Sequence, residues 1–364
     1  MAVTELIPEI GAAAVGAAVA CYLLVRYQEA HVHLSGDDPD GQPQRFHSTP
    51  IPRIGGVGAL AGLLCAALLA IARGVPGAPF FCVLILAAMP AFAGGLFEDF
   101  TGRARPLIRL LLTLVTATAA FAWLGARLYR SDVWWLDAAF RYWPLSLAGT
   151  MIAIGGLAHA MNIIDGSHGL CAGIGVIVLT ALAIVSARLG AQSSALAASA
   201  AAAAFTGFLL LNYPFGRIFL GDGGAYLLGV IVGIVSARLV GKVPPVSPWF
   251  PFALVIYPVW ETLFSALRRL ATDPGSVGRP DALHLHSLIR QRLRETWFAG
   301  DDERSLQLSN ALTAIPLWVM QGAIAWGAVQ WFDRTHMLIA LSLAFVPGYC
   351  VVYWLIRRTE RAPG

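Results

Sequence analysis

Residues 169–187 read GLCAGIGVIVLTALAIVSA, nineteen consecutive residues without a charged side chain. A bilayer core about 30 Å thick needs roughly 20 apolar residues for one helical crossing, so this stretch predicts a transmembrane helix. The rest of the chain is similar, because 57% of its 364 residues are hydrophobic and only 13% are charged, against about 25% in soluble domains. The sequence therefore predicts an all-α, polytopic membrane helical bundle. About eleven segments qualify, at residues 6–25, 54–72, 79–97, 107–125, 144–161, 169–187, 192–211, 218–237, 248–265, 308–331 and 337–356.

The distribution of Lys and Arg predicts which side of the membrane each loop occupies. The first segment is kept as a helix, because Glu5 and Glu9 stand where a signal peptide would carry basic residues. If the N-terminus lies outside, the inner segments hold seventeen of the 25 basic residues and the outer segments hold eight. We therefore predict an external N-terminus and a cytoplasmic C-terminus, with 1–364 forming a single integral membrane domain.

The net charge of +4 is mainly a topology signal, and no nucleic-acid-binding motif accompanies it. We therefore expect no nucleic-acid partner. The five cysteines are unclustered and lie in apolar segments, where a buried small hydrophobic residue is the expected role. No redox chemistry is indicated.

Polar residues near the segment ends gather on the predicted cytoplasmic side. They are Glu98, Asp99, Asn162, Asp165, Asn212, Asp222, His284 and His286. Polar groups at membrane spans are costly and usually functional or paired, so their concentration at one face predicts one site. The alternative is that Asp165 and Asp222 are ordinary helix N-caps.

Glycine-containing turns surround two of these acids, in Asn162-Ile-Ile-Asp165-Gly166-Ser-His168-Gly169 and Phe219-Leu-Gly221-Asp222-Gly223-Gly224. Glycine lets backbone N–H groups approach an oxyanion, and the start of the following helix is electropositive, so these turns predict phosphate binding. Carboxylates beside a phosphate need an intervening cation, and Mg²⁺ binds one or two carboxylates plus phosphate oxygens. Mn²⁺ could replace it. Zinc fits less well, because no Cys accompanies the histidines, and His284 and His286 would point to opposite faces if they lay on a helix. On a loop they could converge.

Five motifs follow one another along the chain. They are Arg45-Phe-His47-Ser-Thr-Pro50-Ile-Pro52-Arg53-Ile-Gly55-Gly56, Glu98-Asp99, Asn162 to Gly169, Asn212 with Phe219 to Gly223, and Arg279-Pro280-Asp281-Ala-Leu-His284-Leu-His286-Ser287. In this order they resemble the motifs of the polyprenyl-phosphate N-acetylhexosamine-1-phosphate transferases, bacterial glycosyltransferases of family 4. Two positions depart from the family pattern, since His168 stands where Asp or Asn is common and Ser287 where a third histidine is usual. Both departures bear on the choice of donor sugar.

The resemblance implies an Mg²⁺-dependent reaction. A sugar 1-phosphate, N-acetylglucosamine or a related N-acetylhexosamine, would pass from a UDP-sugar to undecaprenyl phosphate with release of UMP. This step would initiate a cell-surface polysaccharide such as O-antigen, in the bacterial inner membrane and in contact with its lipids, at a site facing the cytoplasm. The loop at about 266–307 would then be catalytic.

Residue roles are predicted from the same resemblance. The predicted catalytic residues are Glu98, Asp99, Asp165, His284 and His286. The predicted substrate-binding residues are Arg53, Asn162, His168, Asn212, Arg268, Arg269 and Arg279. The predicted metal ligands are Asp222, as first choice, and Asp99.

The main alternative is a transporter or flippase for a lipid-linked sugar, which would also need many spans and polar groups. A translocation path should distribute polar groups across the depth of the bilayer, whereas the predicted segments carry almost no charge at their centres. A membrane phosphatase would need a histidine nucleophile arrangement that the sequence does not supply. The sequence fixes neither the sugar nor the oligomeric state, and a homodimer remains open.

Overall fold

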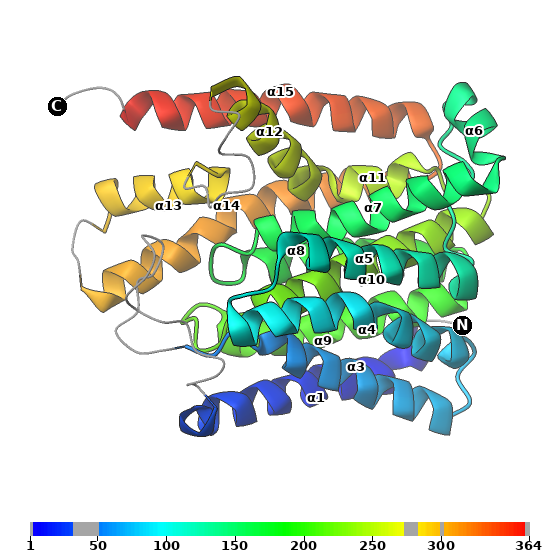
Figure 1. The fold of residues 1–364 in the computed structure, drawn as a ribbon, viewed down its shortest axis with the longest axis horizontal. Coiled ribbons are helices and arrows are strands. Elements are labelled where there is room, and N and C mark those ends of the chain that lie inside the picture. The colour runs from blue at the N-terminus through cyan, green and yellow to red at the C-terminus, as the bar shows by residue number, and fades with distance from the viewer. Residues whose placement is uncertain (1–2, 32–50, 273–282, 299–301, 361–364) are drawn as a thin grey trace.

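The structure is a computed structural model that describes residues 3–31, 51–272, 283–298 and 302–360. Within these residues the chain is helical, and most helices run along one long axis (Figure 1). In order, the elements are η1 (Val3–Leu6), α1 (Ile7–Arg26), η2 (Gln28–Ala30), α3 (Gly55–Ala72), α4 (Ala78–Thr101), α5 (Pro106–Ala119), the π-helical turn η3 (Ala120–Leu124), α6 (Trp134–Phe140), α7 (Trp143–Ile163), α8 (Leu170–Arg188), α9 (Gln192–Asn212), α10 (Gly221–Lys242), α11 (Trp249–Leu254), α12 (Ile256–Thr272), α13 (Leu285–Thr296), α14 (Glu303–Gln330) and α15 (Thr335–Glu360).

Ten helices of the described chain are long and apolar enough to cross a membrane. They are α1, α3, α4, α5 with its π-helical turn, α7, α8, α9, α10, α14 and α15. The predicted all-α, polytopic membrane bundle is thus confirmed. Helix α1 begins and α15 ends at opposite ends of the bundle (Figure 1). The side of the membrane that each end faces stays a prediction.

The ninth predicted segment, residues 248–265, is divided into the short helix α11 and the longer helix α12. Pro258 has no backbone N–H, so the carbonyl four residues earlier, that of Leu254, loses its helical donor. Gln321 of α14 replaces that donor, because its side-chain amide lies 2.8 Å from the Leu254 oxygen. The break lets α12 lean away from the axis of its neighbours (Figure 1).

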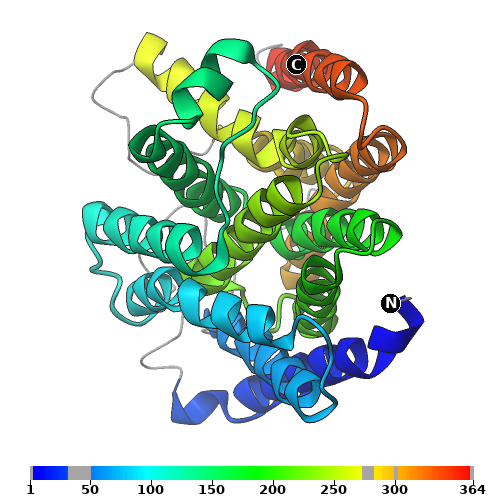
Figure 2. The ribbon, with the colours of Figure 1, turned by 90° about the vertical axis from the view of Figure 1, so that its right-hand side faces the viewer.

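Helix α10 lies at the centre of the bundle and packs against α4, α7, α3 and α8 (Figure 2). Small residues allow the close approach. A Cβ at Gly56 would meet the backbone of Gly224, and one at Gly229 would lie 2.6 Å from the Cα of Ala158. The alanine-rich run from Ala195 to Ala204 on α9 is buried, which fits the use of small residues at contacts between membrane helices.

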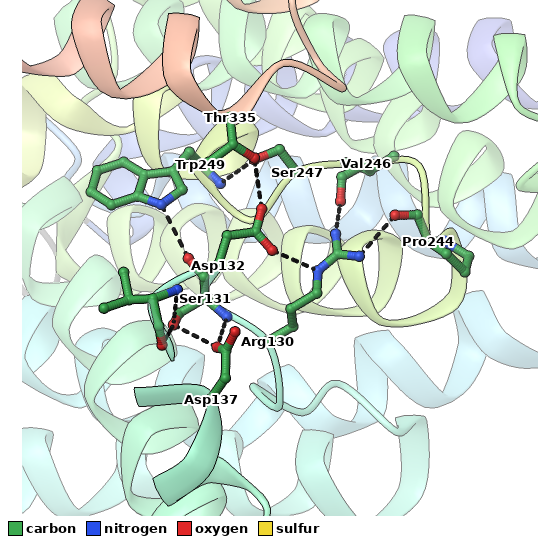
Figure 3. A network of polar contacts seen from close by, with 10 residues as sticks. Arg130, Ser131, Asp132, Asp137, Pro244, Val246, Ser247, Trp249 and Thr335 are labelled. Carbon is green, nitrogen blue, oxygen red and sulfur yellow. Dashed lines mark hydrogen bonds and ion pairs between the residues drawn. The ribbon is translucent and has the colours of Figure 1, made fainter. Parts of the chain in front are cut away.

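A polar network joins two loops and the start of α15 at the end of the bundle where α6 lies (Figure 3). Asp132 forms an ion pair with Arg130, with 3.3 Å between the Oδ1 and Nε atoms. Its other oxygen accepts hydrogen bonds from the hydroxyls of Thr335 at 2.6 Å and Ser247 at 3.4 Å. The Arg130 guanidinium also donates to the backbone carbonyls of Pro244 and Val246. We call Arg130, Asp132, Ser247 and Thr335 the far-end network.

Candidate active site

The start of α10 is fixed to the start of α3 by backbone hydrogen bonds. The amides of Gly55 and Gly56 donate to the carbonyls of Phe219 and Leu220 at 2.8 and 2.9 Å, and the Phe219 amide donates to the Pro52 carbonyl at 2.9 Å. Gly221 then begins α10 with a φ of +76°, in the left-handed region where glycine has little steric cost. This connection places Arg53 beside the first turn of α10.

Asp99, in the last turn of α4, caps α10 from a neighbouring helix. Its two carboxylate oxygens accept the backbone N–H groups of Asp222 and Gly223 at 2.8 and 2.9 Å. The sequence predicted that these N–H groups would be open to a phosphate, and the structure instead pairs them with Asp99. An ionised carboxylate has about four acceptor positions, so Asp99 retains capacity for a cation.

Asp222 lies between two arginines and is not the N-cap of α10, because Leu220 occupies that position. The Nη1 atom of Arg109, on α5, is 2.5 Å from Oδ2 of Asp222. The Nη2 atom of Arg53 is 3.9 Å from Oδ1. Arg109 is one of the seventeen basic residues on the predicted inner side, and its contact with Asp222 was not predicted. Its position one helical turn after Pro106, close to Glu98-Asp99, was the available signal.

Asp165 lies in the turn between α7 and α8. Gly169 occupies the N-cap position of α8, so the alternative of a simple cap is wrong for Asp165 as well as for Asp222. Burial and the nearby Asp222 raise the pKa of Asp165 to about 7, Arg53 lowers it, and Asp99 raises it further. Within the described residues no donor reaches its carboxylate, and only its backbone N–H is bonded, to Asn162 at 3.2 Å. Three carboxylates are thus coupled at this end.

Glu98 and Asn212 hold turns of the backbone. Glu98 accepts the Ala104 amide at 2.6 Å, which fixes the connection between α4 and α5. The side-chain oxygen of Asn212 accepts the Gly169 amide at 2.6 Å, and its nitrogen donates to the Ile218 carbonyl at 2.7 Å. Asn212 is 4% exposed, so its amide joins the end of α9 to the start of α8.

His168 is buried beneath the turn that follows α9. Its backbone amide donates to the Asn310 side chain at 3.0 Å, and its Nδ1 lies 3.1 Å from the Pro214 carbonyl. A carbonyl only accepts, so Nδ1 carries the proton. The ring also lies close to Gly216 and 5.7 Å from the Phe219 ring. The family departure at this position therefore contacts the turn that leads to Asp222.

His284 and His286 converge on this region from α13. Their rings are stacked, with centroids 5.5 Å apart and planes 5° from parallel. The two rings can converge because His284 precedes the first turn of α13 in an extended conformation. The His286 ring lies against Gly166, and Arg290 donates to the Gly166 carbonyl at 3.3 Å. Helix α13 thus covers the turn that carries Asp165.

The remaining predicted arginines lie farther along α12 or outside the described residues. Arg268 donates to Ser265 of its own helix at 3.3 Å, and Arg269 is in the last turn of α12. Arg279 falls in the segment 273–282, which lies outside the described residues.

The carboxylates fit a divalent cation that binds together with a phosphate ligand. Across the described residues, no three Asp, Glu, His or Cys side chains are close enough to hold a metal by themselves. Mg²⁺ does not need such a group, because it commonly takes one or two carboxylates and fills its other positions with water and phosphate oxygens. The coupled carboxylates of Asp99, Asp165 and Asp222 supply only oxygen donors, as Mg²⁺ and Mn²⁺ prefer.

Known proteins with similar sequences are transferases. The family described as "Glycosyl transferase family 4" matches residues 81–240, a range that includes Asp99, Asp165 and Asp222. The decaprenyl-phosphate N-acetylglucosaminephosphotransferase of Mycolicibacterium smegmatis is 27% identical over 356 residues, covering 87% of this chain and 80% of that protein. The undecaprenyl-phosphate alpha-N-acetylglucosaminyl 1-phosphate transferase of Escherichia coli K12 is 26% identical over 334 residues, covering 87% and 86%. Its Yersinia pestis counterpart is 27% identical over 321 residues, covering 85% and 82%.

A polytopic helical bundle, coupled carboxylates at one of its ends and these relatives define a membrane-bound transferase. The chain resembles glycosyl transferase family 4 and, over most of its length, the polyprenyl-phosphate sugar-1-phosphate transferases, so the resemblance predicted from its motifs is confirmed. The transporter alternative has no support, because the relatives named above are transferases.

Proposed function

We propose that the chain transfers N-acetylglucosamine 1-phosphate, or the 1-phosphate of a related N-acetylhexosamine, from a UDP-sugar to undecaprenyl phosphate, with release of UMP. The names of its relatives support the sugar phosphate and the polyprenyl phosphate acceptor. The observation that carries the proposal is the position of Asp222 between Arg109 and Arg53, beside Asp99 and Asp165. This arrangement offers both countercharges for phosphates and carboxylates for a cation.

The reaction forms a bond between an acceptor phosphate oxygen and the β-phosphorus of the donor, and it breaks the bond from that phosphorus to the bridging oxygen of UMP. The acceptor needs little activation, because a phosphate monoester has a second pKa near 6 and is mostly dianionic at neutral pH. Phosphoryl transfer depends mainly on alignment and charge stabilisation. No carboxylate of the chain is therefore required as a general base.

The arginines supply the charge stabilisation that the chain itself provides. Arg53, just before α3, and Arg109, on α5, approach Asp222, and a guanidinium matches phosphate oxygens with a planar pair of donors. Asp99 keeps the first turn of α10 in place, and Glu98 fixes the turn that leads to Arg109. His284 and His286 extend the site toward α13, where donor phosphates or the sugar would bind.

Asp222 and Asp99 would hold Mg²⁺ or Mn²⁺, and the bound cation would neutralise the donor pyrophosphate. Removal of the metal with EDTA should abolish transfer, and excess Mg²⁺ should restore it. Unchanged transfer after EDTA treatment would remove the metal from the proposal.

The predicted location is the bacterial inner membrane, with the carboxylates at the cytoplasmic side, and the predicted pathway is the start of a cell-surface polysaccharide such as O-antigen. The excess of basic residues on one side supports the orientation. Single cysteines introduced near Gly102, labelled in intact and in permeabilised cells, test it. Labelling in intact cells by a membrane-impermeant reagent would reverse the orientation.

The decisive assay uses purified protein, undecaprenyl phosphate, Mg²⁺ and a panel of radiolabelled UDP-sugars. Label that extracts with the lipid, together with an equal amount of UMP, is the expected result. The absence of turnover with every donor would overturn the proposed function.

A further inference from the structure

Glu261 of α12 is a buried acid that the proposed reaction does not use. It is 1% exposed. Its Oε1 accepts the Nδ1–H group of His284 at 2.9 Å and the Leu285 backbone amide at 3.3 Å. Its Oε2 accepts the Tyr349 hydroxyl, on α15, at 2.7 Å. One carboxylate therefore joins α12, α13 and α15.

These contacts determine the protonation of the His284 ring. Three donors converge on the Glu261 carboxylate, an arrangement that suits its ionised, acceptor-only form. The ring nitrogen that faces it, Nδ1, must then carry hydrogen. The Nε2 atom is left as the nitrogen that can contact a ligand, and it has no hydrogen-bond partner among the described residues.

The same contacts position α13 against the carboxylates. Leu285 is the first residue of α13, so Glu261 satisfies one of the backbone N–H groups that every helix start leaves unpaired. The His284 ring stacks on the His286 ring, which lies against Gly166, next to Asp165. A displacement of Glu261 would move both histidines relative to Asp165.

We infer that Glu261 is a positioning residue that holds His284 in its Nδ1–H form and directs Nε2 toward the substrate phosphates. Tyr349 supports it by fixing the second carboxylate oxygen. This inference rests on the proposed function for the role of His284, but the tautomer itself does not depend on that function.

A double-mutant cycle tests whether Glu261 acts through His284. Glu261→Gln should lower kcat by about 10- to 100-fold with little change in the KM for the donor, the loss typical when the carboxylate partner of a functional histidine is removed. His284→Gln should have a similar effect, and the double variant should be no slower than His284→Gln alone. Multiplicative losses in the double variant would overturn the inference.

Two further variants control for general damage. Tyr349→Phe removes one donor and leaves the Glu261 carboxylate in place, so it should lower kcat by less than Glu261→Gln, and only when His284 is present. Asp132→Asn breaks an acid's contacts at the other end of the bundle. Any effect that it has on kcat should multiply with that of His284→Gln. Should Glu261→Gln fail to fold, Tyr349→Phe carries the same cycle.

A spectroscopic measurement tests the tautomer without turnover. Protein with ¹⁵N-labelled histidine in lipid nanodiscs should show an Nδ1–H signal that disappears in His284→Gln and shifts toward the Nε2–H form in Glu261→Gln or Tyr349→Phe. If the signal that is lost in His284→Gln is instead that of an Nε2–H form, the inference is overturned. If the unaltered protein transfers no sugar from any donor while showing the Nδ1–H signal, the proposed function fails and the positioning of the ring stands.

Discussion

The two ends of the bundle treat their carboxylates differently. In the far-end network, Asp132 accepts two hydroxyls and pairs with Arg130, and these partners lie in two loops and at the start of α15 (Figure 3). At the other end, Asp165 receives no donor within the described residues, and Asp222 lies next to two further carboxylates that compete for the same arginines. Both carboxylate oxygens of Asp132 are paired, whereas the other end carries charge that the described residues do not fully neutralise.

This difference separates structure from function. A satisfied polar network rigidifies the segments that it joins, and its loss is felt as a loss of stability. Carboxylates that repel one another lower stability and are kept where they bind a ligand, so perturbed pKa values concentrate at functional sites. An Asp→Asn substitution should therefore lower stability in the far-end network and lower sugar transfer at the other end.

The largest effect is expected for Asp222→Asn. The substitution keeps the shape of the side chain and removes the charge that pairs with Arg109 and that would bind the metal, so kcat should fall by about 10³-fold or more. Release of UMP at saturating Mg²⁺ measures this loss. The melting temperature in detergent should change little, because the variant also relieves repulsion with Asp99 and Asp165. Turnover at the level of the unaltered protein would remove Asp222 from the site.

Arg109→Gln should lower kcat/KM by about 10²-fold, because the side chain that contacts Asp222 at 2.5 Å loses its charge. Arg109→Lys should recover part of this loss, since it restores the charge without the planar pair of donors. Steady-state kinetics with varied donor concentration distinguishes the three proteins. Equal activity of the Gln variant would show that Arg109 serves packing or topology alone.

Asp132→Asn is the matched substitution at the far end. Its amide nitrogen cannot accept from Arg130 or Thr335, so the unfolding free energy should fall by about 1–2 kcal/mol. Sugar transfer measured below the unfolding transition should stay within about twofold of the unaltered protein, because distant sites that share no partners act nearly independently. A loss of transfer comparable to that of Asp222→Asn would remove the contrast between the two ends.

Asp165→Asn should stabilise the protein above neutral pH. The pKa of Asp165 is raised to about 7, so the folded state binds more protons than the unfolded state between pH 4 and 7. Stability is then lost as the pH rises through this range, and Asn avoids the loss. A shift of three pKa units equals about 4 kcal/mol, which solvent screening reduces to an expected gain of about 1–2 kcal/mol at pH 8. Melting temperatures at pH 5 and pH 8 measure it, and equal differences at both pH values would contradict the assignment.

The sequence predicted most of the fold, because each crossing is decided by a local run of apolar residues. It also predicted that Asp99, Asp165 and Asp222 would share one end, since hydropathy gives the position of every segment end. It did not predict the break before Pro258, whose freed carbonyl is bonded by Gln321 from a distant helix. Nor did the sequence predict which groups Asp99 and Asp222 contact. Asp99 caps α10, and Arg109 reaches Asp222 across 113 positions of sequence, contacts that only the packing of helices creates.

Glu261 was a signal in the sequence to which no role was assigned. It is a single acid in the apolar segment 248–265, and an ionisable residue in such a segment is usually functional or paired. The sequence could not name its partners, because His284 and Tyr349 are 23 and 88 positions away. Its burial and its three donors became visible only in the packed structure.

The central claim is that the unneutralised end of the bundle transfers a sugar together with its phosphate. The most direct test supplies purified protein with undecaprenyl phosphate and UDP-N-acetylglucosamine labelled with ³²P at the β-phosphate, and compares the unaltered protein with Asp222→Asn and Asp132→Asn. The account predicts label in the lipid fraction and unlabelled UMP for the unaltered and Asp132→Asn proteins, and neither product for Asp222→Asn. Label that leaves as UDP, or a lipid product without phosphorus from the donor, would contradict it.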